Sequence, residues 1–364
     1  SSHSASGAPK QSVPEKAGAP SLPPCRARPP APGMPAARVA IIFQGTRGDS
    51  QPYFVAGCVL QRAGYDVMLA GSSDSEPLAA QLGLPFVPYL PSTRELITRP
   101  DFVQACTRNS VSSMVKAQSA AELATYPSAA RLLHGLLRDW KPDLVLCGGV
   151  NLLDIMAFSN ALGFAFCLLL LQVSLRSSHV GAMGLLPTCP AWTGLNLVAW
   201  DLLLRCCYTQ ASKDHAPVLE ELLHRPRASF WPTLPEVIDV FSGARTPFPI
   251  FLAVSTALNG PLPRDFSKLC RPLGPLMFSP EEQRGPDFGG AELEAMRAFL
   301  QAGEAPVYLG FGSITCHDAR FMTLLSLRAL RLTGRRGVLL AGWAGMSLQH
   351  LEGAEDEAEL RAYC

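Results

Sequence analysis

The sequence predicts an α/β fold with a doubly wound parallel sheet, followed by the start of a second sheet of the same kind. Short apolar runs rich in β-branched residues alternate with helical segments, which is typical of a parallel sheet. Near residue 307 an apolar run ending in glycines recurs after a segment rich in proline and glycine, which indicates a second domain. A chain of 364 residues is long enough for two.

The chain divides by composition. Residues 1–36 are rich in Pro, Ser, Ala and Gly, and we expect them to be disordered, because they bury too little apolar surface to offset their chain entropy. We predict an N-terminal domain over 37–275, a linker over 276–303 and a second domain from 304 to 364. Only about 60 residues follow Pro306, fewer than the roughly 100 to 150 of an ordinary domain. The second domain is therefore expected to be incomplete.

The first domain opens with a strand, ARVAIIFQ, that is apolar on both faces. A helix follows over Gln51–Ala63, with Pro52 in its first turn and Asp49 or Ser50 as its cap. The further strands that we expect lie at 65–71, 85–90, 141–149 and 164–172. The helices between them lie at 77–84, 112–139 and 154–163.

Residues 174–270 are less regular. The segment Leu195–Tyr208 is apolar nearly all round, so it is either a buried helix or an apolar surface for a ligand. Strands are expected at 249–255, at 305–314 and at 335–345, with helices at 291–302 and in the Leu- and Arg-rich stretch after 316.

Composition excludes several classes of site. A formal net charge of +1 does not favour nucleic acid as a partner. The cysteines lack CxxC spacing and the histidines lack an HExxH motif, so no metal site is expected. No structural disulfides are expected either, and the cysteines favour a cytoplasmic, reducing environment. Ser174 and Ser313 lack the GxSxG context of a hydrolase nucleophile. The first residue is Ser, so a preceding targeting segment stays open.

The turn Gly45-Thr46-Arg47-Gly48-Asp49 after the first strand is the sharpest functional signal. It is either an ordinary βα turn or part of a site, because ligands of open α/β sheets bind at the carboxyl ends of the strands. A helix N-terminus and Arg47 would favour an anion there. The Asp49 carboxylate would be able to accept a proton from a bound hydroxyl.

Two weaker signals accompany it. Gly310-Phe-Gly312-Ser313 either merely reverses the chain or forms a nest of backbone N–H groups for a phosphate. His179 follows a long apolar strand and lies where a ligand would reach it, although a packed or solvent-facing histidine is the more common case.

The two glycine motifs, in this order, resemble those of the sterol 3-beta-glucosyltransferases and their family 28 glycosyltransferase relatives. GTRGDSQP is similar to the entry motif of the first domain, and PVYLGFGSI with LRALRLTGRRGVLLAGWAG is similar to the opening of the second. The resemblance runs from about residue 38 to 353 and is strongest at 40–72 and 304–345.

The resemblance implies a GT-B architecture, in which two Rossmann-like domains bind the acceptor and the UDP-sugar across a cleft and invert the anomeric centre without a metal or another cofactor. Thr46, Arg47 and Asp49 would then contact the donor, Asp49 would also be the base, and Gly312 and Ser313 would lie near the diphosphate. His179 is a weak acceptor-binding candidate. The chain ends before the family's histidine- and glycine-rich nucleotide loop, which suggests a C-terminal truncation.

The function that this predicts is transfer of a hexose, expected to be glucose from UDP-glucose, to a sterol or other lipid, with peripheral contact to a membrane. A truncated, catalytically inactive form that binds the acceptor or has a regulatory role is one alternative. A glycosyltransferase that acts on a secondary-metabolite aglycone is the other.

Overall fold

The computed structural model describes residues 36–107, 111–182, 187–244, 248–280, 282–284, 288, 292–316 and 318–364. The prediction of disorder over 1–36 falls on residues that lie outside this part, apart from residue 36.

The larger unit is built on a parallel sheet of seven strands, in the order β3-β2-β1-β4-β5-β6-β7. This order, with strands added outward on both sides of β1, is that of a doubly wound α/β fold, as predicted. The strands are β1 Arg38–Ile42, β2 Asp66–Ser72, β3 Phe86–Leu90, β4 Leu144–Cys147, β5 Ala165–Leu170, β6 Ile250–Leu252 and β7 Cys270–Pro272. The short strand β7 has no counterpart among the predicted elements.

Alternate side chains of one strand enter two separate cores, one on each face of the sheet. In β1, Val39 and Ile41 belong to one core, whereas Ala40 and Ile42 belong to the other, and all four are buried. A continuous apolar run is therefore required, because neither face of the strand meets water.

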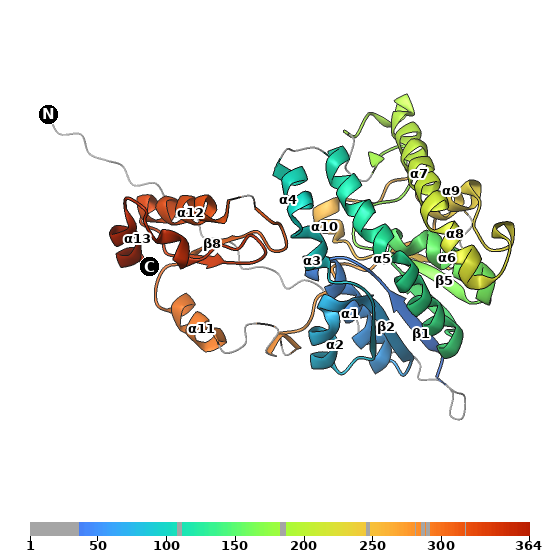
Figure 1. Cartoon of the computed structure of the whole chain (residues 1–364), viewed down its shortest axis with the longest axis horizontal. Coiled ribbons are helices and arrows are strands. Elements are labelled where there is room, and N and C mark those ends of the chain that lie inside the picture. The colour runs from blue at the N-terminus through green and yellow to red at the C-terminus, as the bar shows by residue number, and fades with distance from the viewer. Residues whose placement is uncertain are drawn as a thin grey trace.

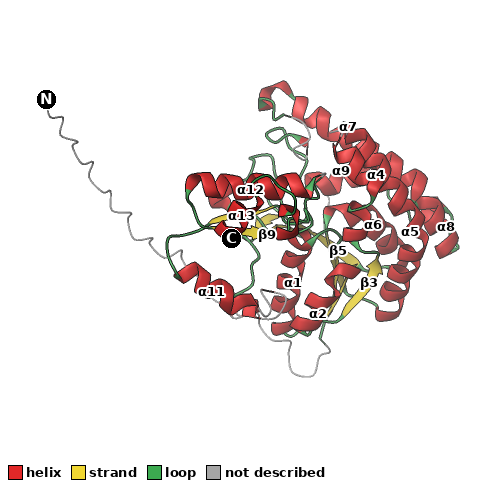
Figure 2. Cartoon of the chain, turned by 60° about the vertical axis from the view of Figure 1, so that its left-hand side comes forward, coloured by secondary structure: helices red, strands yellow, loops and turns green. Residues whose placement is uncertain are grey.

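Helices cover both faces of this sheet (Figures 1 and 2). One core holds side chains of α1 and α2, and the other holds side chains of α5, α6, α8 and α9. The helices of this unit are α1 Arg47–Arg62, α2 Glu76–Leu82, α3 Thr93–Ile97, α4 Pro100–Thr107, α5 Val111–Trp140, α6 Leu152–Leu162, α7 Leu195–Asp214, α8 Ala216–Leu223, α9 Leu234–Ser242 and α10 Thr256–Asn259.

Helix α7 contains the segment Leu195–Tyr208, for which a buried helix and an apolar surface for a ligand were the two predictions. The structure rules out complete burial, and the ligand stays a prediction. Its apolar segment is not buried all round: Trp200 and Leu204 are buried, but Val198 and Leu202 are 63% and 59% exposed. The helix therefore packs with one face only, and the opposite face presents apolar side chains to solvent.

The predicted linker packs partly onto the larger unit. Phe278 is 3% exposed and belongs to the core that α1 and α2 cover. Phe288 meets the Phe278 ring edge-on, and Arg62 of α1 forms an ion pair with Glu282 at 2.9 Å.

The second unit is a two-stranded parallel sheet with helices, drawn in orange to red in Figure 1. Leu327, Leu351 and Leu360 form its small buried cluster. Its elements, with the helix that precedes them, are α11 Leu293–Gln301, β8 Val307–Gly310, α12 Ala319–Thr333, β9 Gly337–Leu340 and α13 Glu357–Tyr363. The strand–helix–strand order matches the one predicted.

Among the described residues, no helix combines the length and the apolarity that crossing a membrane would demand. The cysteines of this part of the chain are all free thiols. Burial raises the pKa of Cys167 to about 12, which identifies it as an inert core side chain rather than a nucleophile.

Candidate functional site

The GTRGD turn lies where β1 gives way to α1, at the carboxyl end of the central strand. Thr46, and not Asp49 or Ser50 as predicted, is the N-cap of α1, because the helix begins at Arg47, four residues earlier than expected. Asp49 Oδ2 accepts hydrogen bonds from the Thr46 N–H at 2.8 Å and from Thr46 Oγ1 at 3.1 Å. Asp49 thus closes the first turn of the helix, while its side chain stays on the exposed surface.

Gly45 is needed for this arrangement. Its φ is +125°, and a Cβ at this position would lie 2.5 Å from Asp49 Oδ2. The glycine therefore lets the Asp49 carboxylate fold back over the backbone, and any side chain would push it away.

Arg47 is held against the linker segment. Its guanidinium lies 4.9 Å from the centre of the Phe288 ring, and its Nε donates to Gln51 Oε1 at 3.1 Å. The arginine, the aspartate and the threonine of the motif share one helix N-terminus, and Arg47 also contacts the segment that leads to the second unit.

The second glycine motif lies at the carboxyl end of β8. Gly312 has φ of +57° and accepts a hydrogen bond from the Trp343 N–H, which lies in the glycine turn after β9, at 3.0 Å. A Cβ on Gly342 would approach the Gly312 carbonyl oxygen to 2.6 Å. The two turns therefore pack backbone to backbone, with Gly312 exposed and Ser313 half-buried.

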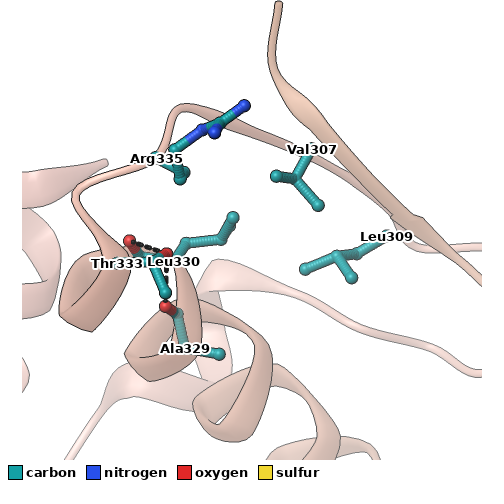
Figure 3. A pocket seen from close by; sticks show the side chains of 6 residues that line it. All are labelled: Val307, Leu309, Ala329, Leu330, Thr333 and Arg335. Atoms are coloured by element: carbon teal, nitrogen blue, oxygen red, sulfur yellow. Dashed lines mark hydrogen bonds between the residues drawn. The ribbon is translucent and has the colours of Figure 1, made fainter. Parts of the chain in front are cut away.

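A hollow of about 520 Å³ lies at the other end of this small sheet (Figure 3). Side chains from β8, from the end of α12 and from the loop after it line the hollow: Val307, Leu309, Ala329, Leu330, Thr333 and Arg335. Thr333 Oγ1 turns back to the carbonyl oxygens of its own helix. None of the predicted site residues lines this hollow.

A cavity of about 170 Å³ lies in the larger unit, beside the turn after β1. Gln44 and Gly45 after β1, Ser72 of β2, Tyr89 of β3 and Asn151 after β4 contribute to its wall. These positions follow or end neighbouring parallel strands, so the cavity opens where ligands of doubly wound sheets bind.

Three polar side chains are joined in the wall of this cavity. Asp154 Oδ1 on α6 accepts from the Tyr126 hydroxyl of α5 at 2.9 Å and lies 3.0 Å from His215 Nδ1. The imidazole of His215 stacks on the Tyr126 ring with a centroid separation of 3.8 Å. Segments that are 28 and 61 residues from Asp154 in the sequence thus converge on one carboxylate.

The surroundings shift the pKa of both partners. Burial is the main reason that the pKa of Tyr126 lies well above its usual range, and the charge of Asp154 adds to it, so the phenol stays protonated. Burial acts to lower the pKa of His215, but the hydrogen bond to Asp154 and the charges of Asp154, Asp214 and Glu122 outweigh it. The pKa of His215 is therefore raised.

A second polar group lines the cavity between β3 and the turn after β4. Asn151 Nδ2 donates to the Tyr89 hydroxyl at 3.0 Å and to Gln44 Oε1 at 3.3 Å. Asn151 Oδ1 is buried without a hydrogen-bond partner among the described residues. Burial raises the pKa of Tyr89 far above its usual range, so Tyr89 also keeps its proton.

His179 is not part of this cavity. It is exposed in the loop after β5, and its backbone N–H donates to Ser177 Oγ at 2.9 Å. Ser177 and Ser178 in turn hold the carboxylate of Asp265, which orders the loop. The histidine that the fold brings to the cavity is His215.

Sequence patterns did not single out Tyr126, Asp154, His215, Asn151 or Tyr89. Tyr126, Asp154 and Tyr89 belong to expected elements and Asn151 lies between two of them, whereas His215 lies beyond the predicted segment that ends at Tyr208. None of the five forms a local motif with another. The one available signal was weak: Asp154 and Asn151 are polar residues directly after the fourth strand, at the strand edge where a ligand is expected. In the described part of the chain, no three His, Cys, Asp or Glu side chains gather as metal ligands would.

Comparison with known proteins supports a relation to glycosyltransferases, although no family model matches the chain. It is 28% identical over 310 residues to glycosyltransferase GtfC of Amycolatopsis orientalis, which covers 85% of this chain and 68% of that protein. It is 25% identical over 313 residues to the vancomycin aglycone glucosyltransferase of the same organism, covering 85% and 69%.

The resemblance to sterol glucosyltransferases is shorter than expected. A sterol 3-beta-glucosyltransferase of Arabidopsis thaliana is 40% identical, but over 48 residues only, which are 13% of this chain and 8% of that protein. The expectation of similarity from residue 38 to 353 is therefore corrected for this family. Relatives that match over 85% of the chain are named as glycosyltransferases, and one of them is named for the vancomycin aglycone.

Solved glycosyltransferases also resemble the chain in structure. The calicheamicin glycosyltransferase CalG4 has a TM-score of 0.48 at 15% identity and covers 84% of this chain and 66% of that one. The kitacinnamycin glycosyltransferase has a TM-score of 0.48 at 14% identity, with 84% and 65% covered. The chain is an α/β protein with a seven-stranded parallel sheet, and its relatives over most of its length are glycosyltransferases.

Proposed function

We propose that the chain takes part in the transfer of a sugar from a nucleotide diphosphate to the hydroxyl of a secondary-metabolite aglycone. The observation that carries the proposal is the cavity at the carboxyl ends of β1 to β4, with hydrogen-bonding groups in its wall. The long sequence matches of the chain are to glycosyltransferases, and one of these is named for the vancomycin aglycone. This replaces the sterol or lipid acceptor as the main prediction, because the match to a sterol enzyme covers 48 residues.

The cavity would hold the acceptor. Its apolar wall would exclude water, and the Asp154–His215 and Asn151–Tyr89 groups would fix the orientation of a polar aglycone. His179, in the loop after β5, stays a weaker candidate for contact with a part of the acceptor outside the cavity.

The donor would lie against the two glycine motifs. We assign contacts with the sugar or diphosphate to Thr46, Arg47 and Asp49, and contacts near the diphosphate to Gly312 and Ser313. The N-terminus of α1 and the Arg47 guanidinium would favour the negative charge that collects on the leaving diphosphate. The name of one relative, dTDP-epi-vancosaminyltransferase, points to a thymidine nucleotide, so dTDP-sugars join UDP-glucose as candidate donors.

In the reaction, the acceptor oxygen attacks the anomeric carbon as the bond from that carbon to the diphosphate oxygen breaks. Asp49 accepts the proton of the attacking hydroxyl, and the diphosphate leaves with the electron pair. The carboxylate is exposed at the end of the central strand, so a hydroxyl is able to approach it. A positioned base of this kind contributes roughly 10²–10⁴-fold to a rate.

The test is transfer by the full chain from UDP-glucose and from dTDP-glucose to vancomycin aglycone and to cholesterol, followed by mass spectrometry. Glycosylated aglycone is the expected product, and Asp49→Asn should lower its rate by about 10²–10⁴-fold. Asn keeps an oxygen that accepts from the Thr46 N–H, so the helix cap survives. Transfer to cholesterol alone would reject the aglycone assignment, and an unchanged rate in Asp49→Asn would remove Asp49 as the base.

A further inference from the structure

The size of the cavity limits what enters it. An engineered protein cavity of about 150 Å³ binds benzene, so a cavity of about 170 Å³ holds one six-membered ring and little more. The apolar part of its wall comes from α3, α5 and α6, through Leu96, Ile97, Ala130, Leu133 and Phe158. These side chains offer a ring hydrophobic contact and no hydrogen bond.

The polar part of the wall has a defined pattern of donors and acceptors. Asp154 Oδ1 accepts from the Tyr126 hydroxyl, and an ionised carboxylate has no proton to give. The short contact of His215 Nδ1 with Asp154 Oδ1 therefore places a proton on Nδ1. In the neutral imidazole, Nε2 is then the nitrogen that is left to accept a hydrogen bond.

The charges around the cavity disfavour an anion. The carboxylates of Asp154 and Glu122 belong to its lining. Among the described residues that line the cavity, His215 is the only histidine, and there is no lysine or arginine. A carboxylate ligand would meet these charges at short range in a partly dehydrated site, where like charges repel strongly. An uncharged ligand avoids this cost.

We propose that the cavity binds one uncharged, hydroxylated six-membered ring, and that His215 Nε2 accepts the hydrogen bond of the ring hydroxyl. That this ring is part of the sugar acceptor rests on the proposed function; the binding itself does not. Asp154 and Tyr126 act through His215: the carboxylate fixes the imidazole tautomer, and the stacked phenol ring fixes the plane of the imidazole.

The bound hydroxyl should favour the neutral imidazole, because a phenol is a good hydrogen-bond donor and a poor acceptor. Four groups set the charge at His215: Asp154 from α6, Glu122 and Tyr126 from α5, and Asp214 at the end of α7. The Tyr126 phenol stays protonated and uncharged. The charges that act on the imidazole are therefore those of the three carboxylates. Phenol should therefore bind more tightly as pH rises through the pKa of His215, and saturation with phenol should lower that pKa.

The experiment titrates the full chain, labelled with ¹³C in its histidine rings, with phenol, benzene and benzoate in the absence of any nucleotide sugar. The expected order of affinity is phenol, then benzene, then benzoate, with the His215 ring resonance shifting and its pKa falling when phenol binds. Equal binding of phenol and benzoate, or an unmoved His215 resonance at phenol saturation, would overturn the proposal.

Variants locate the binding. His215→Phe keeps a ring against Tyr126 but removes Nε2, so phenol affinity should fall about tenfold, to that of benzene. Ala130→Leu places a larger side chain of α5 in the cavity and should abolish the binding of both phenol and benzene. If Ala130→Leu fails to fold, Leu96→Trp blocks the cavity from the half-buried rim instead. His350→Phe, in the second unit, is the matched control and should bind phenol normally.

The outcomes separate this proposal from the proposed function. Phenol binding that Ala130→Leu abolishes, in a chain that transfers no sugar, would leave the ring site standing and reject the transferase. Sugar transfer in a chain where His215→Phe and Ala130→Leu leave phenol binding unchanged would reject the ring site alone.

Discussion

At the scale of single residues, Asp49 in the GTRGD turn has both a structural role, as part of the helix cap, and a proposed chemical role. Asp49 caps α1 through the Thr46 N–H, and its carboxylate is also the group that we assign as the base. The cap holds the carboxylate at the end of the central strand before any ligand arrives. Gly45 makes the arrangement sterically possible.

The role of Gly45 is testable against its neighbour Gly48. Gly45→Ala combines a φ of +125° with a Cβ 2.5 Å from Asp49 Oδ2, so it should destabilise the chain by about 1–3 kcal/mol. Gly48→Ala lies within α1, and the nearest atom to its Cβ is 4.0 Å away, so it should be neutral or stabilise by up to about 1 kcal/mol. Urea unfolding monitored by circular dichroism distinguishes the two.

The charge state of His215 should appear in the pH dependence of stability. Its pKa is raised in the folded chain, so the imidazolium is favoured there. The stabilisation is fully present below the pKa of an unfolded histidine, about 6.5, and is lost as pH rises through the folded pKa. Thermal unfolding of His215→Gln from pH 5 to 8 should lack this contribution.

His134 provides a contrast of opposite sign. Burial lowers its pKa, so its contribution is present above the unfolded pKa and is lost as pH falls through the folded one. His134→Gln should therefore gain stability relative to the parent chain as pH falls from 7 to 5. The same trend in both variants would contradict the assigned pKa shifts.

At the scale of elements, strands were easier to infer than the exposure of helices. A strand buried on both faces has an apolar run that few other structures share, as in β1 and β5. Helix α7 is apolar almost all round in sequence, but it packs along one face only. Its exposed side depends on where neighbouring elements stop, which no pattern within the helix records.

Two positions on α7 test this difference. Trp200 is fully buried and its Nε1 donates to the Val180 carbonyl oxygen at 3.0 Å, so Trp200→Ala should cost about 3–5 kcal/mol. Val198, two residues away, is 63% exposed, so Val198→Ala should change the free energy of unfolding by less than about 0.5 kcal/mol. Similar losses at both would show that the outer face of α7 is covered in solution.

At the scale of the whole molecule, the linker packs against the larger unit as well as leading to the second one. Phe278 inserts into the core beside α1, Phe288 meets both Phe278 and Arg47, and Glu282 pairs with Arg62. These contacts bring the GTRGD helix against the segment that leads to the second unit. A movement of this segment would therefore change the contact between the Phe288 ring and the Arg47 guanidinium.

Adjacent residues in the linker offer a matched test of this packing. Phe278→Ala should destabilise the larger unit by about 3–5 kcal/mol, because the ring is 3% exposed. Met277→Ala, at a position 67% exposed, should have an effect below about 0.5 kcal/mol. Trp343→Phe leaves tryptophans in the larger unit only. Denaturation of the full chain with this background substitution, read by tryptophan fluorescence, would show whether Phe278 belongs to the core of that unit.

The sequence by itself determined the doubly wound sheet, the order of its main strands and helices, and the two glycine motifs at strand ends. Those features are local: apolar runs set the strands, and glycines mark the turns that need unusual backbone angles. The residues that form the candidate cavity are not close to one another in the sequence. Asp154, Tyr126 and His215 lie far apart in the chain, and only the packing of α5, α6 and the α7–α8 corner brings them to one carboxylate. Tertiary structure decided that site, because a hydrogen bond between distant segments leaves no periodicity or spacing in either one.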